Sequence, residues 1–240
     1  MSTQSANGRP TANRILKQIP PEEYDRLSPH LEHVTLSRGD ILYHPQDPVS
    51  HVYFPNRGTV SVVATFADGG GVEVGVVGNE GVFGINVVLG SVTTPHEALV
   101  QQPGDALRAN ADVLRREFNH CGRLHDLLLR YTQAFIVQIA QTAACNKAHP
   151  LDGRLARWLL MACDRATGDK LELTHEFMAL MLGTRRAGVT EAAGKLQDTG
   201  LIRYRRGHVT VLDRRGLEDA SCECYPVVKK EFERLLGFSG

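Results

Sequence analysis

Apolar side chains recur every three or four residues from Leu114 to Thr142, and this long stripe constrains the fold more than any other feature of the sequence. Such spacing places the side chains on one face of an α-helix. Pro150 cannot continue a helix, so it marks the end of the pattern. We therefore expect a short helix capped by Asn110, followed by a long helix over residues 121–149.

The apolar face of the long helix must be buried, either in its own domain or against the same helix of a second copy. The helix lies between a segment with the pattern of short strands and a segment with the pattern of short helices. A helix that links two such modules is more often paired with a second copy, so we favour that alternative. We therefore predict a dimerisation helix. The residues expected at the dimer interface are Leu124, Leu128, Tyr131, Phe135 and Ile139.

Residues 15–120 have the pattern of short strands separated by turns. Within 59–66, alternate residues share one face of a strand, namely Val60, Val62, Ala64 and Phe66. Turns are expected at 56–58 and at the glycine-rich 68–71, because glycine adopts the positive φ that tight turns require. The glycines that recur every three residues over 75–84 are not followed by the Gly-Lys-Ser/Thr of a phosphate loop. These features predict an antiparallel β-roll of jelly-roll type.

The segment 173–202 fits a helix-turn-helix. Thr174 is expected to cap a first helix over residues 175–182, Gly183 to supply the turn, and Thr184 to cap a second helix over 185–197. Small and apolar residues occupy the positions where the two helices must meet, namely Ala179, Leu182, Val189, Ala192 and Leu196.

The outward face of the second helix carries side chains of the types that can read DNA bases. Arg185 and Arg186 can each donate to both acceptors of a guanine, Thr190 can contact a phosphate or a thymine methyl, and Glu191 can accept from cytosine. The alternative is a generic helical pair with solvated arginines.

A helix is expected over residues 151–165, before the helix-turn-helix. After the second helix, apolar and polar residues alternate on either side of Arg206-Gly207, which predicts a β-hairpin. The hairpin would act as a wing that lies against the DNA backbone. Thr184, Arg205, Arg206 and His208 are the residues expected to hold that backbone. Charge agrees with this prediction, because residues 151–216 hold 12 basic and 8 acidic side chains in a chain whose totals balance at 27 each.

With these motifs, the chain resembles the Crp/Fnr type of transcription regulator over roughly residues 15–220. The resemblance rests on the turn at Gly39-Asp40, the strand at 52–58, the linking helix and, most specifically, the winged helix-turn-helix. It implies an α+β protein with an N-terminal β-roll, a long dimerisation helix and a C-terminal winged helix-turn-helix. It also implies a homodimer on palindromic double-stranded DNA, a β-roll that senses a small-molecule effector, and RNA polymerase as a partner.

The expected ranges are a flexible N-terminus over 1–14, a sensor domain over 15–120, the helix over 121–149, the DNA-binding domain over 150–216 and a C-terminal extension over 217–240. The extension is expected to be helical, with Asp213 as its cap, and to pack onto the DNA-binding domain.

The sequence departs from family members that bind cyclic AMP. Those have a Gly-Glu pair and, later, an Arg-Ser pair, whereas this chain has Gly84-Ile85-Asn86 and, later, His96. No arginine occurs between Arg57 and Arg108, so a cyclic phosphate would lose its guanidinium partner. We do not expect cyclic AMP to bind in the usual way, and Gly84, Ile85, Asn86 and His96 mark only where an effector pocket would lie. The effector itself is unknown.

An iron–sulfur cluster and a mononuclear metal site are not expected either. Iron–sulfur members need several N-terminal cysteines, but the first cysteine here is Cys121. His33, His44, Asp47 and His51 are loosely spaced and are expected to be exposed loop residues. Cys222 and Cys224, if both lie on a helix, point apart, and no second pair completes a site. No nucleophile motif supports an enzyme.

Two other functions remain open at this stage. One is a thiol-responsive or redox-responsive regulator acting through Cys145 or Cys163, and the other is a module that binds polyanions or proteins without sequence preference. The five cysteines, an odd number without a secretory signal, indicate reduced thiols, and no apolar run is long enough to span a membrane. A cytoplasmic protein without a membrane partner is therefore expected.

Overall fold

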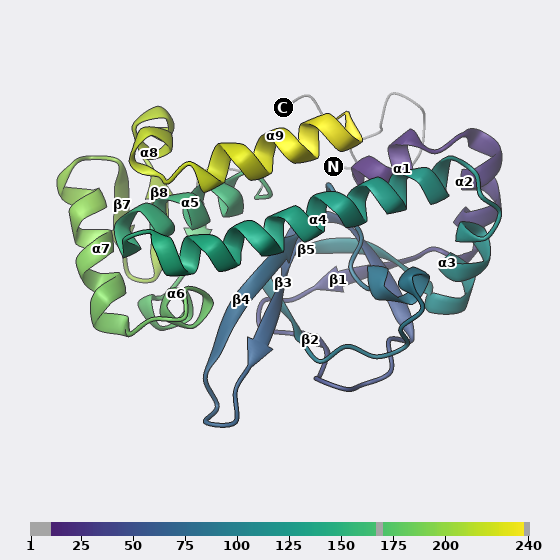
Figure 1. The fold of residues 1–240 in the computed structure, drawn as a ribbon, viewed down its shortest axis with the longest axis horizontal. Coiled ribbons are helices and arrows are strands. Elements are labelled where there is room, and N and C mark those ends of the chain that lie inside the picture. The colour runs from purple at the N-terminus through teal and green to yellow at the C-terminus, as the bar shows by residue number, and fades with distance from the viewer. Residues whose placement is uncertain (1–10, 167–169, 238–240) are drawn as a thin grey trace. The chain divides into compact units, whose positions relative to one another are not determined.

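The computed structural model describes residues 11–166 and 170–237, and these fall into two compact units (Figure 1). The first unit holds the chain up to Val62, then Val76–Phe135, and the chain from Phe232. The second unit holds Val63–Gly75 and Ile136–Glu231. This grouping differs from the predicted ranges, because the long helix and the hairpin that follows residue 62 are each shared between units.

Before the long helix, the chain forms strands with short helices before, between and after them. These elements are α1 (Arg14–Gln18), α2 (Pro21–Leu27), η1 (Ser28–His30), β1 (Glu32–Leu36), β2 (Ile41–Tyr43), β3 (His51–Thr65), β4 (Gly71–Val77), η2 (Ile85–Leu89), β5 (Glu97–Asn110) and α3 (Ala111–Phe118). Asn110 caps α3 by accepting a hydrogen bond from the backbone N–H of Asp112, as predicted.

The strands form one sheet in the order β1-β5-β3-β4, with β2 also paired to β5. β1 runs antiparallel to β5, and Glu32 lies opposite Arg108. The glycine-rich turn predicted at 68–71 joins β3 to β4, with Gly69 at φ +82°. An antiparallel N-terminal sheet domain is therefore confirmed.

The turn predicted at residues 56–58 is wrong, because β3 runs through this segment without a break. Gly58 adopts φ +81°, and a Cβ there would lie 2.6 Å from the carbonyl oxygen of Gln102. Glycine is therefore required for the close approach of β5 rather than for chain reversal. The predicted apolar face also ends early, since Val60 is buried but Phe66 is 56% exposed.

The predicted flexible N-terminus lies outside the described residues as far as residue 10, and its remaining part is packed into the first unit. Asn13 is fully buried and caps α1 by accepting from the backbone N–H groups of Ile15 and Leu16. Its amide group donates to the carbonyl oxygens of Pro55 and Gly81 at 3.1 and 2.8 Å. The side chain satisfies its hydrogen bonds inside the protein, so the packed chain begins before residue 15.

The long helix α4 (Arg123–Ala148) starts two residues later than predicted, because Cys121 has φ +54°. The Glu23 carboxylate accepts hydrogen bonds from the backbone N–H groups of Arg123 and Leu124, both at 2.8 Å, and so caps the helix.

The apolar stripe of α4 is used partly inside the single chain. Leu124, Leu128 and Tyr131 are at most 2% exposed, while Phe135 and Ile139 are of intermediate burial. Close packing explains the buried part, since a Cβ on Gly81 would lie 2.3 Å from the Tyr131 ring. The large apolar side chains that α4 leaves exposed are Leu129, at 44%, and Ile136, at 53%.

The second unit contains the elements that follow α4. They are α5 (Leu151–Cys163), β6 (Lys170–Glu172), α6 (His175–Met181), α7 (Arg186–Asp198), β7 (Ile202–Arg205), β8 (His208–Val211), α8 (Arg214–Ala220) and the start of α9 (Cys224–Leu236). The three strands pair antiparallel in the order β6-β8-β7, and α5 packs against both α7 and α8. A winged helix-turn-helix fold is therefore confirmed, and with it the α+β class.

The first part of the C-terminal extension packs against α5 of the predicted DNA-binding domain, whereas the chain from Phe232 belongs to the first unit. Asp213 caps α8 by accepting from the backbone N–H of Gly216. The Arg214 guanidinium pairs with Asp164 just after α5, and the Tyr225 hydroxyl lies 3.0 Å from the same carboxylate. Among the residues that the structure describes, no helix has the length and apolar character needed to cross a membrane.

Candidate DNA-binding surface

The helix-turn-helix is formed by α6, α7 and the turn between them. Thr174 caps α6 by accepting from the backbone N–H of Phe177, as predicted, and Gly183 in the turn has φ +57°. The prediction that Thr184 caps the second helix is wrong, because the N-cap is Arg185 and no side chain caps α7 there. The backbone N–H of Thr184 instead donates to the carbonyl oxygen of Ala179 at 2.9 Å and closes the turn.

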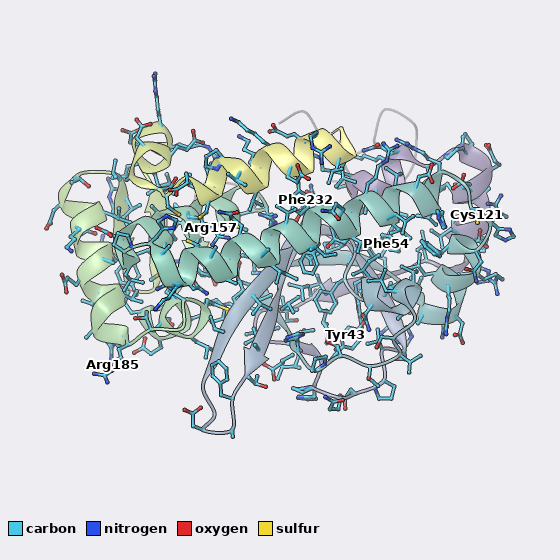
Figure 2. All side chains as sticks on the ribbon, in the orientation of Figure 1. Tyr43, Phe54, Cys121, Arg157, Arg185 and Phe232 are labelled. Atoms are coloured by element: carbon cyan, nitrogen blue, oxygen red, sulfur yellow. The ribbon has the colours of Figure 1, made fainter. Side chains whose placement is uncertain are left out.

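All four residues predicted to read bases are exposed: Arg185 is the N-cap of α7, and the other three lie on the N-terminal half of the helix. Figure 2 shows Arg185 directed away from the ribbon. Arg186 pairs with Glu176 at 2.9 Å, in a pair whose side chains are 68% and 61% exposed. Glu191 similarly pairs with Lys195 at 3.2 Å. Exposed ion pairs of this kind contribute only about 0–1 kcal/mol, so both side chains can exchange these partners for DNA.

His175, which the sequence analysis missed, connects the recognition helix to the wing. Its Nδ1 lies 2.9 Å from the Thr190 hydroxyl oxygen, and its ring stacks on Tyr204 of β7 at 4.1 Å between centroids. Burial, followed by the nearby Arg186 cation, lowers the pKa of His175 from its ordinary value of 6.5. The neutral form of the ring is therefore favoured, and the ring links α7 to β7 through Thr190 and Tyr204.

The wing has the geometry that the Arg206-Gly207 pair predicts. Both residues have positive φ, +50° and +80°, and Arg205 pairs directly with His208 across the hairpin. Arg205, Arg206 and His208 are exposed at its tip, while Thr184 is half-buried in the turn before α7. The structure thus gathers three of the four predicted backbone-contacting residues at one hairpin end. Arg203 is also exposed on β7, and the sequence did not single it out.

The sequence matches two family models. The Crp-like helix-turn-helix domain matches residues 153–220, and the cyclic nucleotide-binding domain matches residues 33–121. The chain has the two domains of a Crp/Fnr-type regulator. Among curated proteins, the global nitrogen regulator of Nostoc sp. is 25% identical over 187 residues, which cover 74% of this chain and 83% of that protein.

Solved structures of Crp/Fnr proteins share the fold. A transcriptional regulator of this family from Eubacterium rectale has a TM-score of 0.68 at 16% identity and covers 86% of this chain and 96% of its own. FixK2 from Bradyrhizobium japonicum has a TM-score of 0.69 at 15% identity and covers 80% and 98%.

The residues predicted to mark an effector pocket lie in the segment over residues 84–96. Gly84 has φ +89°, and a Cβ there would lie 3.2 Å from the Tyr43 hydroxyl oxygen. Ile85 is buried, and the Asn86 side-chain amide donates to the carbonyl oxygen of Thr93 at 3.2 Å. His96 is half-buried. The four predicted effector-pocket residues are therefore in the same loop region, but Asn86 closes the loop.

The residues of this loop do not fit a cyclic nucleotide held through its phosphate. Tyr43 stacks on Phe83 at 5.5 Å, and a buried Ile85 offers no hydrogen bond. Of the nearest arginines in the sequence, Arg108 pairs with Glu32 at 2.6 Å and Arg57 is exposed. A buried phosphate there would therefore lack a charge-assisted partner among these residues.

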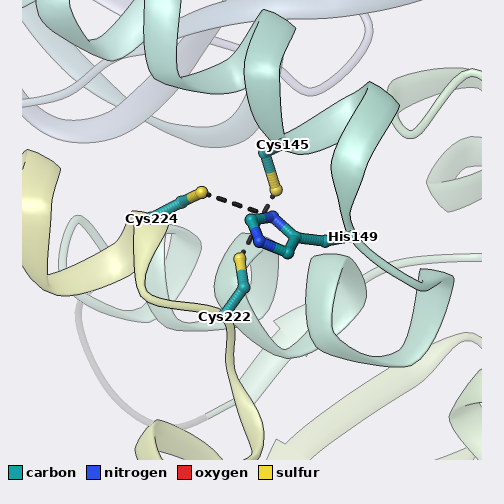
Figure 3. A group of neighbouring side chains, drawn as sticks. All are labelled: Cys145, His149, Cys222 and Cys224. Carbon is teal, nitrogen blue, oxygen red and sulfur yellow. Dashed lines mark hydrogen bonds between the residues drawn. The ribbon is translucent and has the colours of Figure 1, made fainter.

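One group of potential metal ligands comes together among the described residues: Cys145, His149, Cys222 and Cys224, whose ligand atoms all lie within 4.8 Å of one another (Figure 3). Cys145 is on α4, and His149 directly follows that helix. The premise that Cys222 and Cys224 share a helix is wrong, because Cys222 lies in the link before α9 and Cys224 begins α9. His33, His44, Asp47 and His51 form no such group; His33 lies on β1 and pairs with Asp105.

The cysteines in this cluster are buried and hydrogen-bonded. Cys145 and Cys224 are fully buried and Cys222 is 8% exposed. The Sγ atoms of Cys145 and Cys222 are 3.4 Å apart. This hydrogen bond lowers the pKa of the Cys222 thiol to about 5 and, together with burial, raises the pKa of Cys145. The two hydrogen-bonded thiols therefore lose their protons in two separate steps, and the first proton leaves more readily than the second.

Proposed function

We propose that this protein is a sequence-specific DNA-binding transcription regulator that acts in the cytoplasm as a homodimer on a palindromic site. Arg185, Arg186, Thr190 and Glu191 read bases in the major groove. Thr184, Arg205, Arg206 and His208 hold the DNA backbone. The observation that carries the proposal is the exposed, arginine-rich N-terminal half of α7, joined through His175 to a basic wing.

The joint at His175 matters because phosphate contacts set the orientation of a recognition helix and base contacts set its specificity. A wing fixed to α7 transfers its position on the phosphates to Arg186 and Thr190. Tyr204 strengthens the joint further, because its backbone N–H donates to the Gln197 side chain of α7 at 2.8 Å.

The dimer requires an apolar face that the single chain leaves open, and α4 provides one. Leu129 and Ile136 are exposed and seven residues apart, the repeat of a two-stranded coil. Of the five predicted interface residues, the half-buried Phe135 and Ile139 extend this face, whereas Leu124, Leu128 and Tyr131 support it from inside. A second copy covers this face and places one α7 in each half-site.

A regulator bound at a promoter acts through RNA polymerase, and the β-roll is the place where a small-molecule effector would act. The proposal includes no catalytic activity and no response to cyclic AMP through the usual contacts.

A thiol-responsive regulator is the second candidate, and one observation favours Cys145 over Cys163 for it. The Sγ atoms of Cys222 and Cys145 are 3.4 Å apart, so hydrogen peroxide could oxidise the pair: the two thiols lose two protons and two electrons, the sulfurs join in a disulfide, and the peroxide is reduced to two molecules of water. Cys163, the last residue of α5, is half-buried and is not part of the cysteine cluster.

Selection of bound sites from a random duplex library tests the main proposal. The experiment uses the purified full chain at near-physiological salt without added ligand. Enrichment of an inverted repeat supports a dimeric sequence reader. Retention of DNA without sequence enrichment, with and without nucleotides or oxidant, would instead support a non-specific polyanion-binding module.

A further inference from the structure

We propose that Cys145, His149, Cys222 and Cys224 form a tetrahedral site for a single Zn²⁺ ion that attaches the C-terminal extension to the end of α4. A set of three cysteines and one histidine is typical of structural zinc sites. The residues come from two parts of the second unit that are more than 70 residues apart in sequence. Neither the helix-turn-helix nor the wing uses any of them.

The distances fit one ion. Zinc–sulfur bonds of about 2.3 Å and zinc–nitrogen bonds of about 2.0 Å place neighbouring ligand atoms of a tetrahedron roughly 3.5–3.8 Å apart. The Sγ atoms of Cys145 and Cys222 are 3.4 Å apart, and the Sγ of Cys224 lies 3.5 Å from Nδ1 of His149. An iron–sulfur cluster places iron and sulfide atoms between its ligands and requires wider separations. The compact arrangement therefore favours a single ion.

Neighbouring residues orient the ligands as in established zinc sites. Nε2 of His149 lies 3.1 Å from the Glu223 carboxylate, which fixes the ring so that Nδ1 faces the cysteines. The Gln141 side-chain amide donates to the Sγ of Cys224 at 3.1 Å. Carboxylate–histidine and amide–sulfur contacts of this kind surround metal ligands in many proteins. The Glu223 contact favours the His149 tautomer that carries its proton on Nε2, so that the lone pair of Nδ1 can bind a metal.

Charge at the site is also balanced. The three cysteines bind Zn²⁺ as thiolates, and any thiol still protonated releases its proton to solvent as its Zn–S bond forms, so the occupied site carries one negative charge. The Arg157 cation interacts electrostatically with Cys145, and the Arg154 cation interacts with both Cys145 and Cys222. Both arginines belong to α5, and Arg157 is only 4% exposed. Their positive charges offset the charge of the occupied site.

The test uses the untagged full chain, equilibrated with Zn²⁺ under reducing conditions and dialysed against a weak chelator. We expect one zinc per chain by elemental analysis. Replacing zinc with Co²⁺ should give the strong absorption bands of a tetrahedral cobalt–thiolate complex. The Cys145→Ser/Cys222→Ser double variant should retain less than a tenth of the metal. Cys121→Ser, which changes an exposed cysteine outside the group, should retain all of it.

A second variant keeps the test valid if the double variant fails to fold. Glu223→Gln leaves all four ligands in place but weakens the contact that orients His149, so zinc affinity should fall about 10–100-fold. Asp219→Asn, a nearby exposed change, is the matched control. The proposal is overturned if the wild-type chain retains no zinc, if acid-labile sulfide accompanies iron, or if mass spectrometry finds a Cys145–Cys222 disulfide instead of bound metal.

Discussion

The second unit holds both the candidate recognition surface, which consists of Arg185, Arg186, Thr190 and Glu191, and the cysteine–histidine cluster beside α9. The two sites differ in how exposed their polar groups are. Arg185 and Arg186 of the recognition surface are exposed, and Arg186 can readily exchange its ion pair with Glu176 for a contact to DNA. The cluster buries its cysteines and directs them toward one another. Exposed groups with weak partners are suited to an external ligand, whereas converging buried groups are suited to an ion held permanently.

The largest expected effect comes from removing the proposed ion. With free Zn²⁺ at about 1,000 times its dissociation constant, binding adds roughly 4 kcal/mol to the free energy of unfolding, so chelation should remove that amount. Urea unfolding of the zinc-loaded chain, with and without a strong chelator, measures the difference. The Cys121→Ser variant should respond as the wild type does. A chelator that left the wild-type midpoint unchanged would show that the buried cluster needs no metal for stability.

At the recognition surface, Arg186→Ala should have the next largest effect. Loss of a two-point contact to guanine should reduce discrimination at one base pair by about 1–3 kcal/mol. Binding to the selected site and to its single-base variants measures this loss. Arg215→Ala, which removes an exposed arginine of α8 outside the proposed DNA contacts, should leave the base preference unchanged. If discrimination changed at no position, the assignment of Arg186 to a base would be wrong.

The wing should respond differently from the recognition helix. Arg206→Ala should weaken binding to all sequences alike and reduce the slope of log affinity against log salt by about one, because one phosphate contact is lost. Titrations at several salt concentrations, on the selected site and on unrelated DNA, measure both effects. A loss confined to the selected site would instead make Arg206 a base reader.

The two regions also differ in how far the sequence predicts them. The recognition surface depends on local signals, and Thr174, Gly183 and the Arg206-Gly207 turn act as predicted because caps and positive φ are properties of short segments. The N-cap shifts by one residue, from Thr184 to Arg185, because the backbone contact of Thr184 with Ala179 closes the turn first.

The cluster could not be predicted in the same way, because the chain between Cys145 and Cys222 has to fold before the two meet. One local signal was available, since Cys145 and His149 are four residues apart at the end of a helix and so lie on one face. Tertiary contact also decides the course of β3 at Gly58, where the approach of β5 requires glycine within a continuous strand. Spacing alone predicted a turn there.

The smallest effect concerns His175, which contacts Thr190 of α7 and stacks on Tyr204 of the wing. Burial and the Arg186 cation lower its pKa, whereas the Glu176 carboxylate raises it. Titration of the ring by NMR should therefore give a pKa below 6.5, shifted upward by Arg186→Ala and further downward by Glu176→Gln. Because the unfolded chain binds this proton more readily, the stabilising contribution is present above the ordinary pKa and falls as pH drops through 6.5 toward the folded value. An Arg186→Ala variant with an unchanged His175 pKa would show that the arginine lies away from the joint, and so outside the recognition surface as drawn.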